Sequence, residues 1–259
     1  MITATLERKQ QALHEFTARL LASPVAGEIA KLVLYGSAAR GDANADSDVD
    51  VLVFAAGALR EVERVSGEMA SAVWLEQGER VEPMVYSWNA ETVANSPFLH
   101  RVLREGREVY HMADDTLKRK EIETLYGLAG KYLRVAQMLA QADDEGQWRA
   151  AIDTGYNAVE LCGKAFLREV MDSAPKTYGG IQPMFSDKYI KTGKFPHDFA
   201  HDLGLSLNFR HSARYDGNAA IRKEMVEHVL RVGDHMLARL AEHLAQASAD
   251  PDEGNSGPA

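Results

Sequence analysis

The chain has 259 residues and a formal net charge of −9. This acidic balance argues against a protein that coats duplex nucleic acid, because such binding depends on Lys and Arg replacing counterions at the phosphates. The single Cys excludes a disulfide framework and a multi-thiolate metal site. The sequence has no apolar run of membrane-spanning length and no basic-then-apolar leader, so we expect a soluble cytoplasmic protein with two compact domains.

The first part of the chain predicts a small α/β domain over 1–112. Residues 3–23 have apolar side chains at helical spacing and predict an amphipathic helix that packs on a sheet. A second helix is predicted at about 58–76, and a short one within 96–111. Strands are predicted at about 31–35, 49–54, 80–87 and 107–111. Together these elements predict a mixed sheet with helices on its exposed side.

After Tyr110 the pattern changes to long amphipathic segments without strand alternation, which predicts an all-α bundle over 113–247. Helices are predicted at about 114–142, 148–172, 198–214 and 218–247. Residues 173–196 are rich in Gly, Pro and Lys and too long for an ordinary helix connection, which predicts a functional loop or lid with a short helix. Gly179-Gly180 would be its hinge. The polar end at 248–259 is expected to be disordered.

The segment LVLYGSAARGDANADSDVDVLVF at 32–54 combines a phosphate-binding turn with two carboxylates between apolar strands. Gly36 and Ser37 end the first strand, and the short helix that follows offers backbone N–H groups to a triphosphate, with the Ser37 hydroxyl beside them. Asp48 and Asp50 are two residues apart on the next strand, so they share a face and can hold Mg²⁺ against phosphate oxygens. The segment therefore predicts phosphoryl-type chemistry.

Two further polar residues of this segment each have two interpretations. Arg40 either contacts a phosphate of the nucleotide or pairs with a local carboxylate such as Asp42 or Asp46, and the pattern favours neither. Ser47 is predicted mainly to hold its loop by hydrogen bonds to nearby backbone, with a contact to the nucleotide as its second role.

Gly36-Ser37-x-x-Arg40-Gly41 followed by Ser47-Asp48-x-Asp50 resembles the minimal branch of the nucleotidyltransferase superfamily of the DNA polymerase beta type. The resemblance implies transfer of a nucleoside monophosphate from an NTP, most often ATP, to a hydroxyl, with release of pyrophosphate. It also implies two Mg²⁺ ions on Asp48, Asp50 and a third carboxylate. Glu82 is the expected third carboxylate and the base, and Glu79 at the strand entrance is the alternative.

The second half resembles HEPN domains, helical bundles often encoded beside or fused to minimal nucleotidyltransferases. The resemblance rests on AIDTGYNAVELCGKAFLREV at 151–170 and NFRHSARYD at 208–216. It implies a homodimer assembled mainly through the helical domain. HEPN domains that cut RNA carry Arg, four to six residues, then His, and neither Arg210 nor Arg214 is followed by that spacing. We therefore expect no RNA cleavage.

The acceptor of the nucleotidyl group is either a small molecule or a protein side chain, and we expect it to bind between the domains. Polar side chains on neighbouring turns of the predicted helix at 148–172, among them Tyr156 and Glu160, have two interpretations. They form a polar cluster that binds the acceptor, or they are satisfied groups of the bundle core. The stretch 188–214 is a modest basic patch, which is either a solvated face or a site for an anionic or hydroxyl-rich acceptor. The candidate acceptor residues are Tyr156, Glu160, Lys188, Arg210 and His211. The alternative function is a toxin-antitoxin-type or regulatory nucleotide-binding module without turnover.

Overall fold

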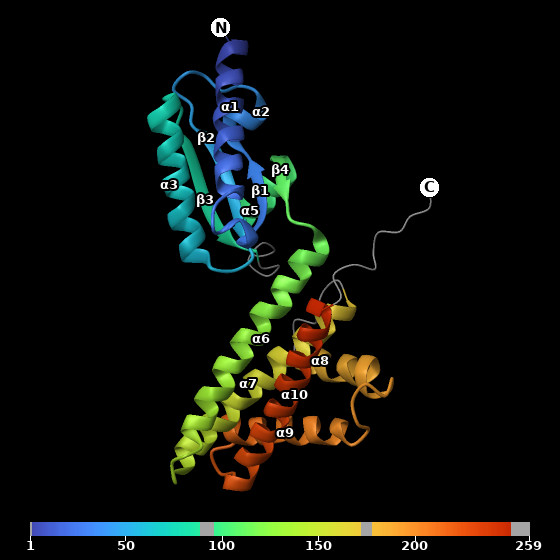
Figure 1. Ribbon diagram of the computed structural model, residues 1–259. Helices are drawn as coiled ribbons and strands as arrows, with labels where there is room; N and C mark the ends of the chain where they lie inside the picture. Colours follow the sequence, from blue (N-terminus) through green and yellow to red (C-terminus); the bar gives the residue numbers. More distant parts are fainter. Residues whose placement is uncertain (1, 89–95, 172–177, 250–259) are drawn as a thin grey trace, which may run out of the picture. The chain divides into compact units, whose positions relative to one another are not determined.

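The computed structural model describes residues 2–88, 96–171 and 178–249. The chain forms two compact units, 1–120 and 121–259, shown in Figure 1 and described one at a time below. The division lies inside helix α6 (Asp114–Leu139), later than the predicted boundary after residue 112. The last helix, α10 (Lys223–Ala249), includes the first two residues of the predicted disordered tail, and the rest of that tail lies outside the described residues.

The first unit contains a four-stranded mixed sheet, as the sequence predicts. Its strands are β1 (Ile29–Leu34), β2 (Val49–Ala55), β3 (Val81–Ser87) and β4 (Arg107–His111). They lie in the order β3-β2-β1-β4, with β1 antiparallel to both β2 and β4, and β2 parallel to β3. Strand β3 is thus at the edge of the sheet and pairs with β2 alone.

Helices cover both faces of this sheet rather than one. They are α1 (Ile2–Leu21), α3 (Leu59–Gln77) and α5 (Pro97–Glu105), with short turns η1 (Ala26–Glu28) and α2 (Gly36–Arg40) between strands and helices. Val51 and Val53 of β2 pack in one core with α1 and α3, whereas Leu52 and Phe54 pack in a second core with α5. The alternation of strand side chains thus divides β2 between two cores.

The second unit is a helical bundle, as predicted. Besides the rest of α6 and α10 it contains α7 (Glu145–Val170), α8 (Tyr178–Phe185), the π-helical turn η2 (Ser186–Ile190) and α9 (Phe199–Tyr215). Helix α7 is central and contacts α8, α9 and α10. Gly155 of α7 leaves room for this contact, because a Cβ there would lie 3.2 Å from Val229 Cγ1 of α10.

The short helix predicted within the loop or lid at 173–196 is present as α8, but the rest of this prediction is wrong for the part of the segment that the structure describes. Residues 178–190 are helical, and Gly179-Gly180 lie inside α8 instead of forming a hinge. Residues 173–177 lie outside the described residues. The segment places aromatic side chains in the core of the bundle: Phe185, Tyr189 and Phe195. Because their burial stabilises the bundle, the segment is part of the fold despite its Gly, Pro and Lys content.

Across the described ranges, no helix combines the length and the apolar composition that a membrane crossing requires.

Candidate active site

Three neighbouring side chains form a row across β1, β2 and β3. Asp50 and Glu82 are register partners on the parallel strands β2 and β3. The backbone N–H of Tyr35, which directly follows β1, donates to the carbonyl oxygen of Asp50 at 3.0 Å. Since opposite residues on paired strands point to the same face, Tyr35, Asp50 and Glu82 lie together on the face covered by α5.

Gly36 brings the backbone of the next turn against Asp50. Its φ of +71° lies in the left-handed region, and a Cβ at this position would lie 2.0 Å from Asp50 Oδ2. Only glycine meets both conditions without strain. The turn predicted to hold phosphates therefore touches one of the predicted metal-binding carboxylates.

Negative charge accumulates around Asp50. Burial raises the pKa of Asp50, and the nearby carboxylates of Glu82 and Asp48 raise it further, whereas Arg40 lowers it. Burial, followed by the charges of Asp50 and Glu82, raises the pKa of the Tyr35 phenol to about 12, so its hydroxyl is protonated at neutral pH. A bound cation would relieve this excess of negative charge.

The donor chemistry fits a hard divalent cation, since the three carboxylates offer only oxygen ligands. Within the described part of the chain, however, no three His, Cys, Asp or Glu side chains stand grouped as a metal site. Asp48 Oδ1 lies 3.7 Å from Arg80 Nε. A metal ion on these carboxylates would thus compete with Arg80 for Asp48.

The two candidates for the third carboxylate differ in their surroundings. Glu79 is buried and pairs with Lys9 at 2.5 Å and with Arg8 at 3.5 Å. Lys9 is itself only 3% exposed and also donates to the Ala45 carbonyl at 3.4 Å. Glu79 thus holds α1 against the entrance of β3, whereas Glu82 is exposed beside Asp50. This arrangement favours Glu82 as a ligand.

Ser47 and Arg40 both make local contacts. The Ser47 hydroxyl accepts from the Asn44 N–H at 2.9 Å and donates to Asn44 Oδ1 at 3.2 Å, which agrees with its main predicted role in the loop. Arg40 Nε donates to Asp42 Oδ2 at 3.3 Å on the surface. Its effect on the pKa of Asp50 also places its charge near the carboxylates.

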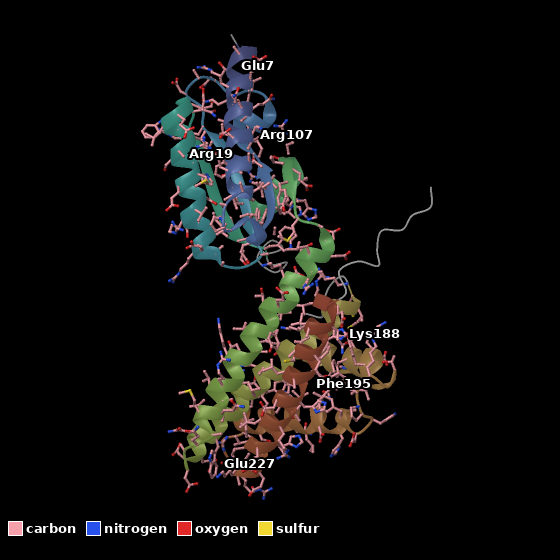
Figure 2. All side chains as sticks on the ribbon, in the orientation of Figure 1. Glu7, Arg19, Arg107, Lys188, Phe195 and Glu227 are labelled. Carbon is pink, nitrogen blue, oxygen red and sulfur yellow. The ribbon has the colours of Figure 1, made fainter. Side chains whose placement is uncertain are left out.

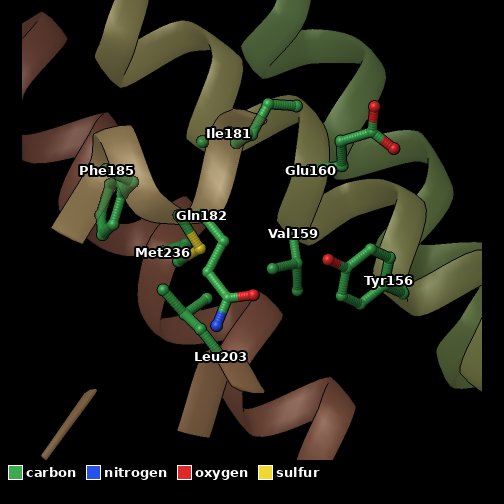
Figure 3. Close-up of a pocket in the computed structure, with 9 residues that line it drawn as sticks. Tyr156, Val159, Glu160, Ile181, Gln182, Phe185, Leu203 and Met236 are labelled. Carbon is green, nitrogen blue, oxygen red and sulfur yellow. The ribbon is translucent and has the colours of Figure 1, made fainter. Parts of the chain in front are cut away.

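The candidate acceptor residues of the helical unit do not form one site. Tyr156 and Glu160 line a small hollow between α7, α8, α9 and α10 (Figure 3). Lys188 and His211 are exposed and do not line it, and Figure 2 shows Lys188 at the surface of this unit. The remaining lining residues are mainly apolar: Val159, Gly163, Ile181, Gln182, Phe185, Leu203 and Met236.

Arg210 is buried in the helical unit and paired with other side chains of that unit. It is 3% exposed, pairs with Asp153 at 3.1 Å and lies 5.1 Å from the centre of the Tyr156 ring. Arg214 pairs with the same carboxylate at 3.2 Å. Tyr156 is therefore a satisfied group of the bundle interior, which was the alternative interpretation of the polar cluster. Arg210 was predicted as part of the basic patch at 188–214, and its burial contradicts the interpretation of that position as a solvated face.

Comparison with known proteins supports the chemistry that this geometry suggests. Residues 19–90 match the family model of the nucleotidyltransferase domain. The match includes the Gly36 turn and all the carboxylates discussed above, from Asp48 to Glu82.

Individual proteins resemble the chain more distantly. It is 27% identical over 126 residues to "Putative toxin MJ0142" of Methanocaldococcus jannaschii, which covers 49% of this chain and 83% of that protein. A nucleotidyltransferase-like protein from Exiguobacterium sibiricum aligns over 95% of this chain and 81% of its own, with 10% identity and a TM-score of 0.36. Spectinomycin adenyltransferase AAD(9) from Enterococcus faecialis, solved with ATP and spectinomycin, aligns over 90% and 99%, with 11% identity and a TM-score of 0.32.

Proposed function

We propose that the first unit transfers a nucleoside monophosphate from an NTP, with ATP as the first candidate, to a hydroxyl acceptor. The observation that carries this proposal is the contact of the Gly36 turn with Asp50, in a row with Glu82, inside a nucleotidyltransferase domain. A phosphate-binding turn against a carboxylate cluster is the arrangement that phosphoryl-type transfer needs, because this chemistry depends on positioning and charge neutralisation.

In this proposal each residue of the site has a role. The Gly36 backbone and the Ser37 hydroxyl hold the β and γ phosphates, and Arg40 provides positive charge beside them. Asp48 and Asp50 supply oxygen ligands for two Mg²⁺ ions, and Glu82 completes the second metal site and accepts the proton of the acceptor hydroxyl. The bound ions would neutralise the triphosphate and polarise the reacting oxygens.

Calorimetry with ATP and Mg²⁺ tests the assignment. Asp48→Asn and Asp50→Asn should each weaken Mg²⁺-dependent ATP binding about 10- to 100-fold, since each removes a charged ligand. The matched control is Asp46→Asn, which makes the same change at an exposed position of the loop before β2 and should bind as the unmodified protein does. Equal affinity for ATP and equal dependence on Mg²⁺ in all three variants would contradict the assignment of Asp48 and Asp50 to the site.

Thermal unfolding without Mg²⁺ separates lost binding from lost folding. The raised pKa of Asp50 means that its contribution to stability is present at low pH and is lost as the pH rises through that pKa. Asp50→Asn removes this repulsion, so the variant should melt at the same temperature or higher at neutral pH while it fails to bind.

A second candidate function is a toxin-antitoxin-type module, either with a protein side chain as acceptor or without turnover. The similarity to a relative with a toxin name favours it. Release of pyrophosphate from ATP in the presence of Mg²⁺ and an acceptor distinguishes an enzyme from a nucleotide-binding regulator.

We further propose that the helical unit is HEPN-like and forms a homodimer. The segment 151–170 lies in α7, and residues 208–215 of the second segment lie in α9. The lack of RNA cleavage remains a prediction from the missing Arg-to-His spacing. The sequence predicts surplus apolar positions on the long helices, and α6 exposes such residues at helical spacing. They are Leu128, Tyr132, Val135 and Met138.

Light scattering tests the homodimer. The protein should be dimeric at tens of micromolar, where an interface of about 1,600 Å² normally persists. Val135→Glu should shift it to monomer, because a charge in an apolar contact is desolvated without a partner. Trp74→Glu, at an exposed apolar position on α3, is the control and should leave the dimer intact. A monomeric unmodified protein would contradict the proposal.

A further inference from the structure

Beside the carboxylate row, the same face of the sheet continues into partly exposed apolar side chains. Met84 and Tyr86 follow Glu82 on β3 at alternate positions, where they pair with Leu52 and Phe54 of β2. Alternate strand residues share a face, so Met84 and Tyr86 lie on the same face as Glu82. We name the following set the aromatic wall: Tyr35, Met84, Tyr86 and Phe98.

The members of the aromatic wall contact one another. The Phe98 ring of α5 lies 5.8 Å from the Tyr35 ring, edge to face, and 6.5 Å from the Tyr86 ring. The Tyr35 hydroxyl donates to Met84 Sδ at 2.9 Å. The rings are therefore held in place by their neighbours, which is the condition for a preorganised binding surface.

Two members of the wall are large apolar side chains that are partly exposed. Met84 is 40% exposed and Phe98 is 38% exposed. Adjacent exposed apolar groups often mark a binding site, particularly where polar groups border them. Here the border is formed by Asp50 and Glu82, the carboxylates of the proposed reaction.

We propose that the aromatic wall is the acceptor subsite of this nucleotidyltransferase domain, and that it takes an uncharged or cationic hydroxyl compound with a planar ring. The inference rests on the proposed function and specifies its substrate class. Glu82 can accept the hydroxyl proton only from an acceptor within hydrogen-bond reach, and the surface next to Glu82 on β3 is the wall. The part of the acceptor that bears the hydroxyl therefore packs on these rings.

The charge of the site sets the charge of the acceptor. In the proposed reaction the three carboxylates and the triphosphate together carry more negative charge than two Mg²⁺ ions would neutralise, so the site repels an anionic acceptor and attracts a cationic one. The sequence, by contrast, predicts an anionic or hydroxyl-rich acceptor from the basic stretch 188–214, which belongs to the other unit.

In the transfer step the acceptor oxygen bonds to the α-phosphorus, and the bond from that phosphorus to the bridging oxygen of the β-phosphate breaks. Pyrophosphate leaves with the bonding pair, and the hydroxyl proton passes to Glu82. The wall orients the acceptor ring so that its oxygen approaches from the side opposite pyrophosphate.

Methyl NMR of the full-length protein labelled at methionine tests this subsite, with the Met84 signal assigned through Met84→Leu. The probes are tyramine, a cationic ring hydroxyl compound, 4-hydroxyphenylacetate, its anionic counterpart, and ethanolamine, a cationic hydroxyl compound without a ring. Tyramine should shift the Met84 signal at concentrations where the other two do not. An equal response to the anionic probe, or no response to tyramine, would overturn the inference.

Variants test the ring contact. Phe98→Ala and the bulk-preserving Phe98→Leu should both weaken tyramine binding about three- to tenfold, as expected for the loss of one aromatic contact. Trp74→Ala, which removes an exposed ring from α3, should not change it. Unchanged tyramine affinity in Phe98→Leu together with an unchanged Met84 response would contradict the role of the ring.

A final experiment has two purposes. It tells whether the wall binds the acceptor or the nucleobase, and it can reject this inference without rejecting the proposed function. With Mg²⁺ and the non-hydrolysable α,β-methylene-ATP bound, Met84 should still respond to tyramine. Competition between the two would assign the wall to the nucleobase and overturn the inference. Binding of Mg²⁺-ATP without any tyramine response would leave the proposed function standing and reject the subsite alone, whereas absence of Mg²⁺-ATP binding would reject the proposed function.

Discussion

Gly36→Ala should abolish detectable binding of Mg²⁺-ATP and lower the melting temperature. The new Cβ would lie 2.0 Å from Asp50 Oδ2, so either the turn or the carboxylate has to move. The φ of +71° adds a backbone cost of about 1–2 kcal/mol for any residue with a Cβ. Calorimetry with ATP and Mg²⁺ and a thermal melt of the same sample measure the two effects.

Gly78→Ala is the matched control for this variant. Gly78 has the same φ of +71°, but nothing lies within 4 Å of the Cβ that alanine would add. It should therefore show the backbone cost alone and keep its nucleotide affinity. If Gly36→Ala binds Mg²⁺-ATP as Gly78→Ala does, the close approach of the turn to Asp50 is not required for binding.

Lys9→Met should destabilise the protein by about 3–5 kcal/mol, since it leaves the carboxylate of Glu79 buried without its main partner. The double variant Lys9→Met/Glu79→Leu should recover most of this loss, because replacing both charges by apolar groups of similar volume removes the desolvation cost. Denaturant unfolding followed by circular dichroism gives the free energies.

Arg8→Met is the control for the buried pair. Arg8 contacts the same carboxylate at 3.5 Å, but its side chain is 61% exposed, so the change should cost less than about 1 kcal/mol. Lys9 also donates to the Ala45 carbonyl, in the loop that leads to Asp48. We therefore expect the double variant to regain stability without regaining full affinity for Mg²⁺-ATP. Equal stability of Lys9→Met and Arg8→Met would contradict the structural role of the pair.

The sequence contains a signal for Lys9 that composition and motif analysis did not use. Lys9, Leu13, Phe16 and Leu20 follow one another at helical spacing, so the lysine lies on the buried stripe of α1. A cation on such a stripe needs a buried partner. The spacing indicates that a partner exists, but it cannot say that the partner comes from the entrance of β3.

The sequence by itself determined the elements and the central motif of this protein. The strands were predicted from short apolar or alternating runs and the long helices from apolar spacing, because these patterns reflect the backbone of the element itself. The same is true of Asp48 and Asp50, whose common face follows from the strand period. The pairing of Gly36-Ser37 with this strand was recognisable because all its parts lie within one short segment.

Only the tertiary structure showed how residues with the same chemistry differ in their surroundings. The sequence favours Glu82 over Glu79 through the resemblance alone, and Lys9, the partner that buries the carboxylate of Glu79, lies about 70 residues away along the chain. The Gly- and Lys-rich segment at 178–196 was predicted as a loop, yet its aromatic side chains are buried against α7. The aromatic wall likewise combines β1, β3 and α5. These features depend on which distant surfaces meet, and burial and charge pairing between such surfaces have no local period that a sequence can display.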